Sequence, residues 1–358
     1  GAEPATDLSF IKYHMKELLG ATIEELKLFA EELGEKSFRG KQLFVWLNRG
    51  VRDFDEMTDL PKGFREKLIA AQSEGRIRIG GCTVDSVQED KSDGTKKFLF
   101  DCGGDAVEGD FMKYRYGNSL CVSSQVGCRM GCRFCASALG GFVRNLTPGE
   151  MLGQVLAAEA YTGEKIGHVV VMGMGEPFDN YDNVAAFLRL LHSPDGHNMS
   201  YRNMTVSTSG IIPAIERFGE DFSQAGLAIS LHRADADGRS AIMPVNRRYP
   251  VDMLIAAARR YTEKTRRRIT FEYTLIRGEN DRPEDIALLK AKLKGMLCHV
   301  NLIPLNPVKE TGFTGSAGRR AAEIAAQLEA AGISATVRRE LGAEIDGACG
   351  QLRLKKRR

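Results

Sequence analysis

The sequence predicts an α/β fold: an open, partial (βα)6 barrel that follows a small helical domain and a β-hairpin region. From about residue 119 onward, strand-like and helix-like segments alternate, which is typical of right-handed βαβ units around a parallel sheet. Six such units are too few for a closed eight-stranded barrel. Helical spacing dominates residues 1–75, and short alternating strands occupy residues 76–117. We therefore divide the chain into regions 1–75, 76–117 and 118–358.

The first region is predicted to be helical. Leu8–Leu19 has apolar residues at helical spacing, and Thr22 with Glu25 forms a capping box in front of a second helix. Two more helices are predicted over Arg39–Asn48 and from Pro61 to about Ala71. Together these segments predict a small helical domain.

The second region is predicted to form antiparallel hairpins. Lys96–Asp101 and Asp110–Tyr116 have alternating patterns and flank a turn at Gly103 and Gly104. By this pattern alone, Glu108 is a solvent-exposed hairpin carboxylate.

The third region carries the barrel. The predicted strands are Leu120–Ser123, His168–Met172, Met204–Ser207, Leu227–Leu231, Arg268–Leu275, Val300–Leu305 and Ala335–Arg338. The predicted helices are Thr147–Tyr161, Tyr181–Leu191, Ile211–Phe218, Val251–Thr262, Pro283–Leu293 and Gly318–Ala331. Polar and Gly-rich motifs follow the strands, and the chemistry of a parallel barrel gathers at the carboxyl ends of its strands. Asp235–Asp237 are expected to be loop residues.

The composition is typical of a soluble globular chain. Of 358 residues, 43% are apolar and 27% are charged, which excludes disorder as the main state. No apolar run reaches the ~18 residues of a transmembrane helix, and Gly1–Asp7 lacks the pattern of a secretory signal. We expect a cytoplasmic protein without a membrane partner.

The charge pattern leaves nucleic acid binding open. The net charge is only +3, but bases cluster at 259–268 and at 355–358. Such clusters can bind phosphates, and they can equally be solvated faces.

Three of the eight cysteines form a tight motif. Cys128, Cys132 and Cys135 have the spacing C-x3-C-x2-C, and close thiolates are the preferred ligands of iron–sulfur clusters. The missing fourth local cysteine would leave one iron open to a substrate. Zinc is the alternative, although its usual second ligand pair is absent.

The sequence around the other cysteines says less about their role. A large chain without an export signal favours a reducing compartment over disulfides. Cys82, Cys102 and Cys298 match no motif, and we expect them to be structural.

The cysteine motif resembles that of radical S-adenosylmethionine enzymes, whose open iron binds S-adenosylmethionine. Over nearly the whole chain, the sequence resembles one family of them, the dual-specificity ribosomal and transfer RNA adenine carbon-2 methyltransferases. The resemblance is carried, in order, by the segments 119–128, 141–146, 172–177, 206–210, 230–232, 299–307 and 348–352. It implies a partial barrel of the radical S-adenosylmethionine type, with an N-terminal domain that contacts RNA.

The resemblance also implies site residues. Cys128, Cys132 and Cys135 would hold a 4Fe–4S cluster. S-Adenosylmethionine would be bound by Gly175, Glu176, Ser207, Ser230, Leu231, His232 and Asn306. The catalytic residues would be Cys349 as the S-methylcysteine intermediate, Cys121 as its partner thiol and Glu108 as a proton acceptor. Arg233 departs from the family, in which a small residue is commoner, and raises a question about local substrate contacts.

The implied chemistry uses two molecules of S-adenosylmethionine per turnover, because carbon 2 of adenine is too electron-poor for a simple displacement. One methylates Cys349, and the second yields a radical that takes hydrogen from that methyl group. The resulting radical adds to the adenine, which joins the RNA to Cys349. Cys121 then releases the methylated base and forms a Cys121–Cys349 disulfide, which must be reduced.

The implied partners are 23S ribosomal RNA, transfer RNA beside its anticodon, and a reductant of the flavodoxin type; we expect a monomer. Two other functions stay open. One is the related enzyme that methylates carbon 8 of the same ribosomal adenine and confers antibiotic resistance. The other is a non-catalytic RNA-binding protein with a metal-stabilised loop, for which Cys121, Cys349 and Glu108 would be needless.

Overall fold

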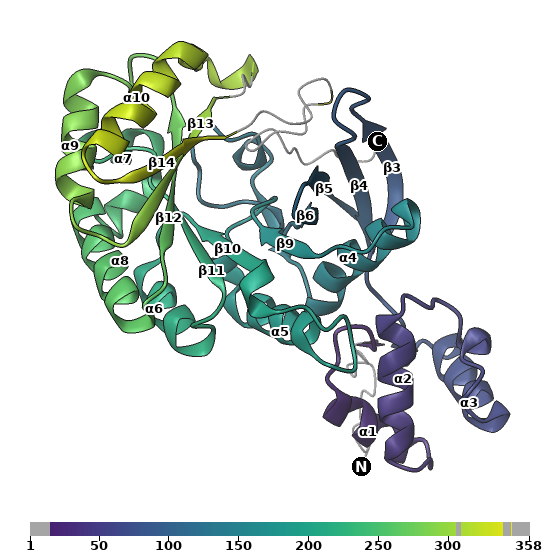
Figure 1. Cartoon of the computed structure of the whole chain (residues 1–358). Helices are drawn as coiled ribbons and strands as arrows, with labels where there is room; N and C mark the ends of the chain where they lie inside the picture. Colours follow the sequence, from purple (N-terminus) through teal and green to yellow (C-terminus); the bar gives the residue numbers. More distant parts are fainter. Residues whose placement is uncertain (1–14, 306–308, 339–344, 346–358) are drawn as a thin grey trace, which may run out of the picture.

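The computed structural model describes residues 15–305, 309–338 and 345, and it has an N-terminal helical domain beside a large curved sheet (Figure 1). The domain contains α1 (Ile23–Glu32), α2 (Phe38–Asn48) and α3 (Lys62–Ser73). The predicted capping box is confirmed, since the Thr22 amide donates to the Glu25 carboxylate at 2.7 Å and the Glu25 amide to the Thr22 hydroxyl at 3.2 Å.

The helix predicted over Leu8–Leu19 is wrong where the structure describes it. Lys16–Glu17 form strand β1, which pairs in parallel with β2 (Ile77–Arg78). The backbone continues this pairing, because the Leu18 amide donates to the Arg78 carbonyl at 2.9 Å. The extended backbone buries both Leu18 and Leu19. Residues 8–14 lie outside the described chain.

The predicted hairpins are present and belong to the same sheet as the barrel. Strands β3 (Thr83–Glu89), β4 (Lys96–Cys102) and β5 (Asp105–Tyr114) are antiparallel. The turn between β4 and β5 has positive φ at Gly103 and Gly104, as glycine allows. Strand β5 begins at residue 105 rather than 110, because its first half pairs with β4 and is largely buried.

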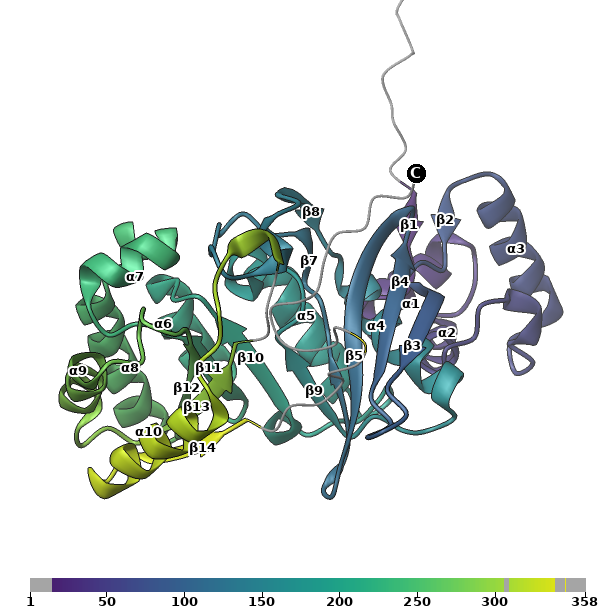
Figure 2. The same cartoon turned by 90° about the horizontal axis from the view of Figure 1, so that it is seen from above.

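The partial barrel is confirmed. The main sheet has the order β14-β13-β12-β11-β10-β9-β6-β5-β4-β3, and its pairs from β6 to β14 are parallel. Its parallel strands are β6 (Gly117–Cys121), β9 (His168–Val171), β10 (Met204–Thr208), β11 (Gly226–Ser230), β12 (Ile269–Leu275), β13 (Cys298–Pro304) and β14 (Ser334–Val337). Figure 2 shows the open, curved sheet from above.

Helices cover the outer face of the sheet (Figure 1). They are α4 (Pro148–Thr162), α5 (Tyr181–His192), α6 (Ile212–Asp221), α8 (Val251–Thr265), α9 (Pro283–Leu293) and α10 (Gly318–Ala330). Strand residues such as Val206, Phe271 and Val300 are fully buried, which fits the near-continuous apolar runs of parallel strands covered by helices.

Three elements near the barrel mouth were not predicted. Strands β7 (Gln125–Gly127) and β8 (Phe142–Asn145) form a two-stranded ribbon on either side of the cysteine motif. Helix α7 (Ala236–Ile242) replaces part of an expected loop, because the Asp235 carboxylate accepts from the Gly238 amide at 2.6 Å and caps it. Short 3-10 helices occupy Phe54–Glu56, Ala136–Ala138, Pro177–Asn180, Tyr201–Asn203, Pro244–Arg247 and Lys309–Thr311.

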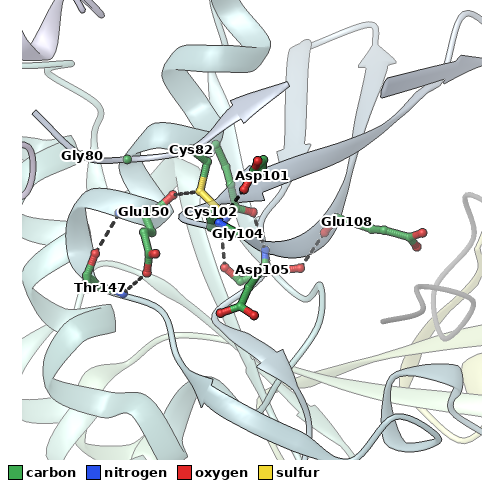
Figure 3. Close-up of a disulfide and its surroundings, with 12 residues drawn as sticks. Gly80, Cys82, Asp101, Cys102, Gly104, Asp105, Glu108, Thr147 and Glu150 are labelled. Atoms are coloured by element: carbon green, nitrogen blue, oxygen red, sulfur yellow. Dashed lines mark hydrogen bonds between the residues drawn. A yellow bond between two sulfur atoms is a disulfide. The ribbon is translucent and has the colours of Figure 1, made fainter. Parts of the chain in front are cut away.

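Cys82 and Cys102 form a disulfide, which corrects the expectation of reduced cysteines (Figure 3). The bridge has a Cα–Cα separation of 4.4 Å and connects the segment before β3 with the end of β4. The Cys82 sulfur also lies 3.2 Å from the Glu150 carbonyl in α4. The two cysteines therefore do have a structural role, as expected, but as a bonded pair. Cys298 is a buried free thiol.

No helix in the described residues combines the length and apolarity needed to cross a bilayer.

Breaking the disulfide should destabilise the fold. The bridge closes a loop with a sequence separation of 20 residues, and a link of this kind stabilises by about 2–4 kcal/mol. Denaturant unfolding of Cys82→Ala/Cys102→Ala should show a loss of this size. A Cys298→Ala control keeps the bridge. Alkylation of both Cys82 and Cys102 in unreduced, denatured protein would contradict the assignment.

Candidate active site

The cysteine motif is held in place by backbone contacts at both ends. The Cys128 amide donates to the Gly141 carbonyl at 2.9 Å, and the Arg133 amide to the Ile242 carbonyl at 3.0 Å. Gly127 has φ +73°, and a Cβ there would lie 1.9 Å from the Gly141 carbonyl oxygen. Only glycine allows this close approach, so Gly127 fixes the start of the motif against β8.

Cys128, Cys132 and Cys135 line one pocket at the carboxyl ends of the barrel strands. The pocket comprises about 980 Å³ of empty space, open solvent at its mouth included. Among the predicted residues, its lining also includes Gly175, Glu176, Ser207, Ser230 and His232. The structure thus brings together eight of the predicted site residues.

Two thiols of the motif, those of Cys128 and Cys132, are partly buried. Burial raises the pKa of Cys128 to about 12, and burial raises the pKa of Cys132 well above its ordinary value. A buried thiolate therefore needs positive charge beside it.

Gly175 and Glu176 form a turn after β9. Gly175 has φ +101°, and a Cβ there would lie 2.5 Å from the Gln125 side chain. The buried Glu176 carboxylate accepts from the Ser209 amide at 2.7 Å and from the Phe178 amide at 3.0 Å. Burial raises its pKa, and these hydrogen bonds oppose the rise. Glu176 therefore ties the turn after β9 to the loop after β10.

His232 is buried and neutral. Burial, and then the charge of Arg239, lower its pKa to about 3. Its Nδ1 accepts from the Thr274 amide at 3.0 Å, so the proton of the neutral ring is on Nε2. Its φ is +54°, which is uncommon outside glycine. The Phe134 ring lies edge-on to it at 4.8 Å.

Leu231 does not line the pocket, and its side chain is fully buried in the hydrophobic core. Its amide donates to the Glu272 carbonyl at 3.0 Å, and its carbonyl accepts from Arg239 at 3.1 Å. Asn306 and Cys349 lie outside the described residues.

Arg239 is a site residue that the sequence did not indicate. It is fully buried in α7 and donates to the carbonyls of Ser209 at 2.7 Å and Ser230 at 3.1 Å. Burial lowers its pKa to about 10, so it stays charged at neutral pH. It thus connects the loops after β10 and β11 and places a cation near Cys132. A lone arginine in an expected loop gave no signal of this role.

Gln125 and the pocket residues Glu272 and Thr274 were also missed. The Gln125 side chain accepts from the Glu176 amide at 2.8 Å and donates to Asp179 at 2.9 Å. The position of Gln125 three residues before Cys128 was the sequence feature that could have indicated its role.

Glu108 is buried, so the exposed hairpin position that its local pattern suggested is wrong. Its carboxylate lies 3.1 Å from the Lys97 amine, and both side chains are less than a tenth exposed. Cys121 ends β6, is buried and pairs in register with Asp110 of β5. Glu108 and Cys121 do not line the pocket of the three cysteines.

Arg233 and the basic cluster at 259–268 both form ion pairs within the protein. Arg233 is buried and contacts Asp235 at 2.7 Å, Glu279 at 3.3 Å and Asp285 at 3.6 Å. The 259–268 cluster contacts the acidic side of α6, through Arg260–Glu216 at 2.6 Å and Lys264–Glu220 at 2.7 Å. Part of this cluster is therefore neutralised within the protein, which weakens it as a phosphate-binding surface.

Comparison with known proteins places the chain in a family. The model of the radical SAM superfamily matches residues 122–289, and that of the ribosomal RNA large subunit methyltransferase N-terminal domain matches residues 16–73. A probable dual-specificity RNA methyltransferase RlmN of Alkaliphilus oremlandii is 47% identical over 342 residues, which are 95% of this chain and 98% of that protein. The chain belongs to the RlmN family. A second relative of the same description, from Thermoanaerobacter sp., is 46% identical over 345 residues, 96% of this chain and 98% of that protein.

A solved structure agrees with this membership. The radical SAM methyltransferase of Sphaerobacter thermophilus has a TM-score of 0.89 and 42% identity, and the match covers 94% of this chain and 99% of that one. The RlmN relatives do not favour the carbon-8 enzyme or the non-catalytic RNA-binding protein. Membership in the radical SAM superfamily implies a 4Fe–4S cluster and S-adenosylmethionine as cofactors.

The chemistry of the motif cysteines suits such a cluster. Thiolates are the preferred ligands of iron–sulfur clusters, and the pocket lining contains all three cysteines of the motif. Within the described ranges, no group of three or more His, Cys, Asp or Glu side chains is arranged to hold a single metal ion.

Substitution of Glu176 should loosen the pocket. Glu176→Gln places an amide donor against the Ser209 or Phe178 amide, and an unsatisfied buried donor costs about 1–3 kcal/mol. We expect a loss of unfolding free energy of that size and weaker S-adenosylmethionine binding in calorimetry. Glu279→Gln is the matched control, because Glu279 is 44% exposed and pairs with Arg233 at 3.3 Å. If both variants lose the same unfolding free energy and the same S-adenosylmethionine affinity, the proposed link between the two loops through Glu176 is contradicted.

Proposed function

We propose that this protein is a radical S-adenosylmethionine methyltransferase that forms 2-methyladenosine in 23S ribosomal RNA and in transfer RNA beside the anticodon. One observation carries the proposal: the three motif cysteines share a pocket with Gly175, Glu176, Ser207, Ser230 and His232. The RlmN relatives, described as dual-specificity RNA methyltransferases, support the RNA substrate. The adenine carbon-2 position follows from the family resemblance.

In this proposal, Cys128, Cys132 and Cys135 hold the 4Fe–4S cluster. The cluster and S-adenosylmethionine, when bound, supply one-electron chemistry and the methyl group. The polar residues of the pocket, with Leu231 and Asn306, bind S-adenosylmethionine. Arg239 and Glu176 position their loops, and the desolvated walls exclude water.

The protein's own groups carry the methyl group to the RNA. Cys349 accepts it as S-methylcysteine and then joins covalently to the target adenine. Glu108 takes the ring proton, and Lys97 holds the Glu108 carboxylate at 3.1 Å. Cys121 then attacks the Cys349 sulfur and releases the methylated base. Its position as the last residue of the parallel strand β6 supports this role, since the chemistry of a parallel barrel gathers at the carboxyl ends of its strands.

The remaining parts of the chain have supporting roles in the proposal. Region 1–75 is an RNA-contacting domain, 76–117 is the hairpin extension, and 118–358 contains the barrel and the Cys349 segment. The enzyme works as a cytoplasmic monomer and receives electrons from a flavodoxin-type reductant.

Mass spectrometry of the modified nucleoside tests the proposal. Anaerobically reconstituted protein, given S-adenosylmethionine, a reductant and 23S ribosomal RNA or transfer RNA, should yield 2-methyladenosine. Cys128→Ala should take up less iron and form no product, because one cluster ligand is lost. The appearance of 8-methyladenosine, or zinc uptake without iron, would overturn the proposal.

Replacement of Cys121 should trap the reaction midway. Cys121→Ala leaves no thiol to attack Cys349, so RNA should stay covalently attached to the protein. Denaturing gel electrophoresis should show a shifted, nuclease-sensitive band. Cys298→Ala is the control, since this buried thiol lies outside the pocket lining. Full product release by Cys121→Ala would remove the proposed role of this thiol.

A further inference from the structure

Asp110 lies beside Cys121, and the reaction described above does not use it. Registered pairing aligns Lys97 of β4, Asp110 of β5 and Cys121 of β6 across three adjacent antiparallel strands. Directly opposed residues have side chains on the same face, with Cβ atoms ~4.5–5.5 Å apart. The Asp110 carboxyl group is therefore a near neighbour of the Cys121 sulfur.

The surroundings of Asp110 leave one of its oxygens unused. The residue is 3% exposed, and its Oδ1 is buried without a hydrogen-bond partner in the described part of the structure. Buried carboxyl oxygens are seldom left in this state. An unsatisfied acceptor next to a thiol can take the thiol proton.

The charges around Asp110 come from several elements. They are Lys97 on β4, Glu108 two residues earlier on β5, and Arg338 just after β14. Lys97 already contacts Glu108 at 3.1 Å, so this lysine balances one of the two acids directly. Burial, followed by the opposing charge of Lys97, sets the pKa of Asp110 at about 8. A carboxyl group with a pKa near the working pH can accept a proton from a neighbouring group.

We propose that Asp110 is the general base that removes the thiol proton of Cys121. The inference rests on the proposed function, because it assigns a task within the release of the methylated base. The S–H bond of Cys121 breaks, the proton forms an O–H bond with Asp110, and the electron pair stays on sulfur. The thiolate attacks the Cys349 sulfur, an S–S bond forms, and the S–C bond to the base breaks.

The electrons of this step balance. The pair of the broken S–C bond stays on carbon, which takes up a proton and becomes the methyl group of the product. The carbon is reduced, and the two cysteines are oxidised to a disulfide. Glu108 and Asp110 thereby have different tasks on one strand: Glu108 acts on the ring proton and Asp110 on the thiol.

The experiment is a single-turnover measurement of RNA adduct formation and release with the reconstituted full chain. Asp110→Asn should form the adduct at the wild-type rate and release it on the order of 10²-fold more slowly, as loss of a general base predicts. The wild-type release rate should rise with pH through about 8, and this rise should be absent in the variant. Asp105→Asn, the same change at the Arg144 pair on the same strand, should release normally.

The outcomes separate the two proposals. Normal release by Asp110→Asn with an unchanged pH profile would overturn the role of Asp110 and leave the proposed function intact. Absence of any adduct or methylated base with the wild-type protein would instead overturn the function. Asp110→Val is a second variant without a titratable group, and it should show the same slow release.

A stability measurement gives a readout that is independent of activity. The pKa of Asp110 is raised by folding, so the unfolded chain loses this proton near pH 4 and the folded protein near pH 8. The contribution of Asp110 to wild-type stability should therefore fall as pH rises across this window. Asp110→Asn has no such titration. Its melting temperature minus that of the wild type should therefore increase as the pH rises over the same window. If the melting temperatures of Asp110→Asn and the wild type differ by the same amount at every pH, Asp110 is not a protonated buried acid, and its proposed role is overturned.

Discussion

The site depends on the satisfaction of buried polar groups at the carboxyl ends of the barrel strands. Strand pairing uses the backbone groups within the sheet, and the loops that follow the strands need other partners. Arg239, Gln125 and Glu176 supply these partners. Each links loops that are distant in the chain, so the pocket shape is fixed by a few hydrogen bonds in a dry environment, where such bonds are strong.

The same constraint gives the site two electrostatic zones. Around the motif cysteines, burial disfavours negative charge on sulfur, and Arg239 is the nearby fixed cation. On the β4–β6 side, Lys97, Glu108 and Asp110 contribute one base and two acids in a buried row. Under the proposed function, the first zone would bind the metal cluster and the second would transfer protons, with no residue common to both.

Much of the architecture could be predicted from sequence, because the barrel segments alternate strongly and end in glycine, proline or capping residues. The bounds of β10, α5 and α9 agree with the prediction to within one residue. The cysteine motif could also be found, since its spacing is local. Long-range pairing could not be predicted, because the partners of β1, Glu108 and Cys82 are 61, 11 and 20 residues away and sequence periodicity does not identify them. Arg239 and Asp110 were missed because a single charged residue has no pattern.

One contact between the N-terminal domain and the barrel lies at strands β1 and β2. Strands β1 and β2 lie at its two ends and pair with each other. Beside them, the Glu17 carboxylate accepts from the Gly81 amide at 2.7 Å and from the Thr147 hydroxyl at 3.0 Å. The covalent connection that follows β2 therefore leaves the domain beside a contact with the start of α4. Movement of the domain at this contact would have to break the hydrogen bonds that Glu17 accepts from both Gly81 and Thr147.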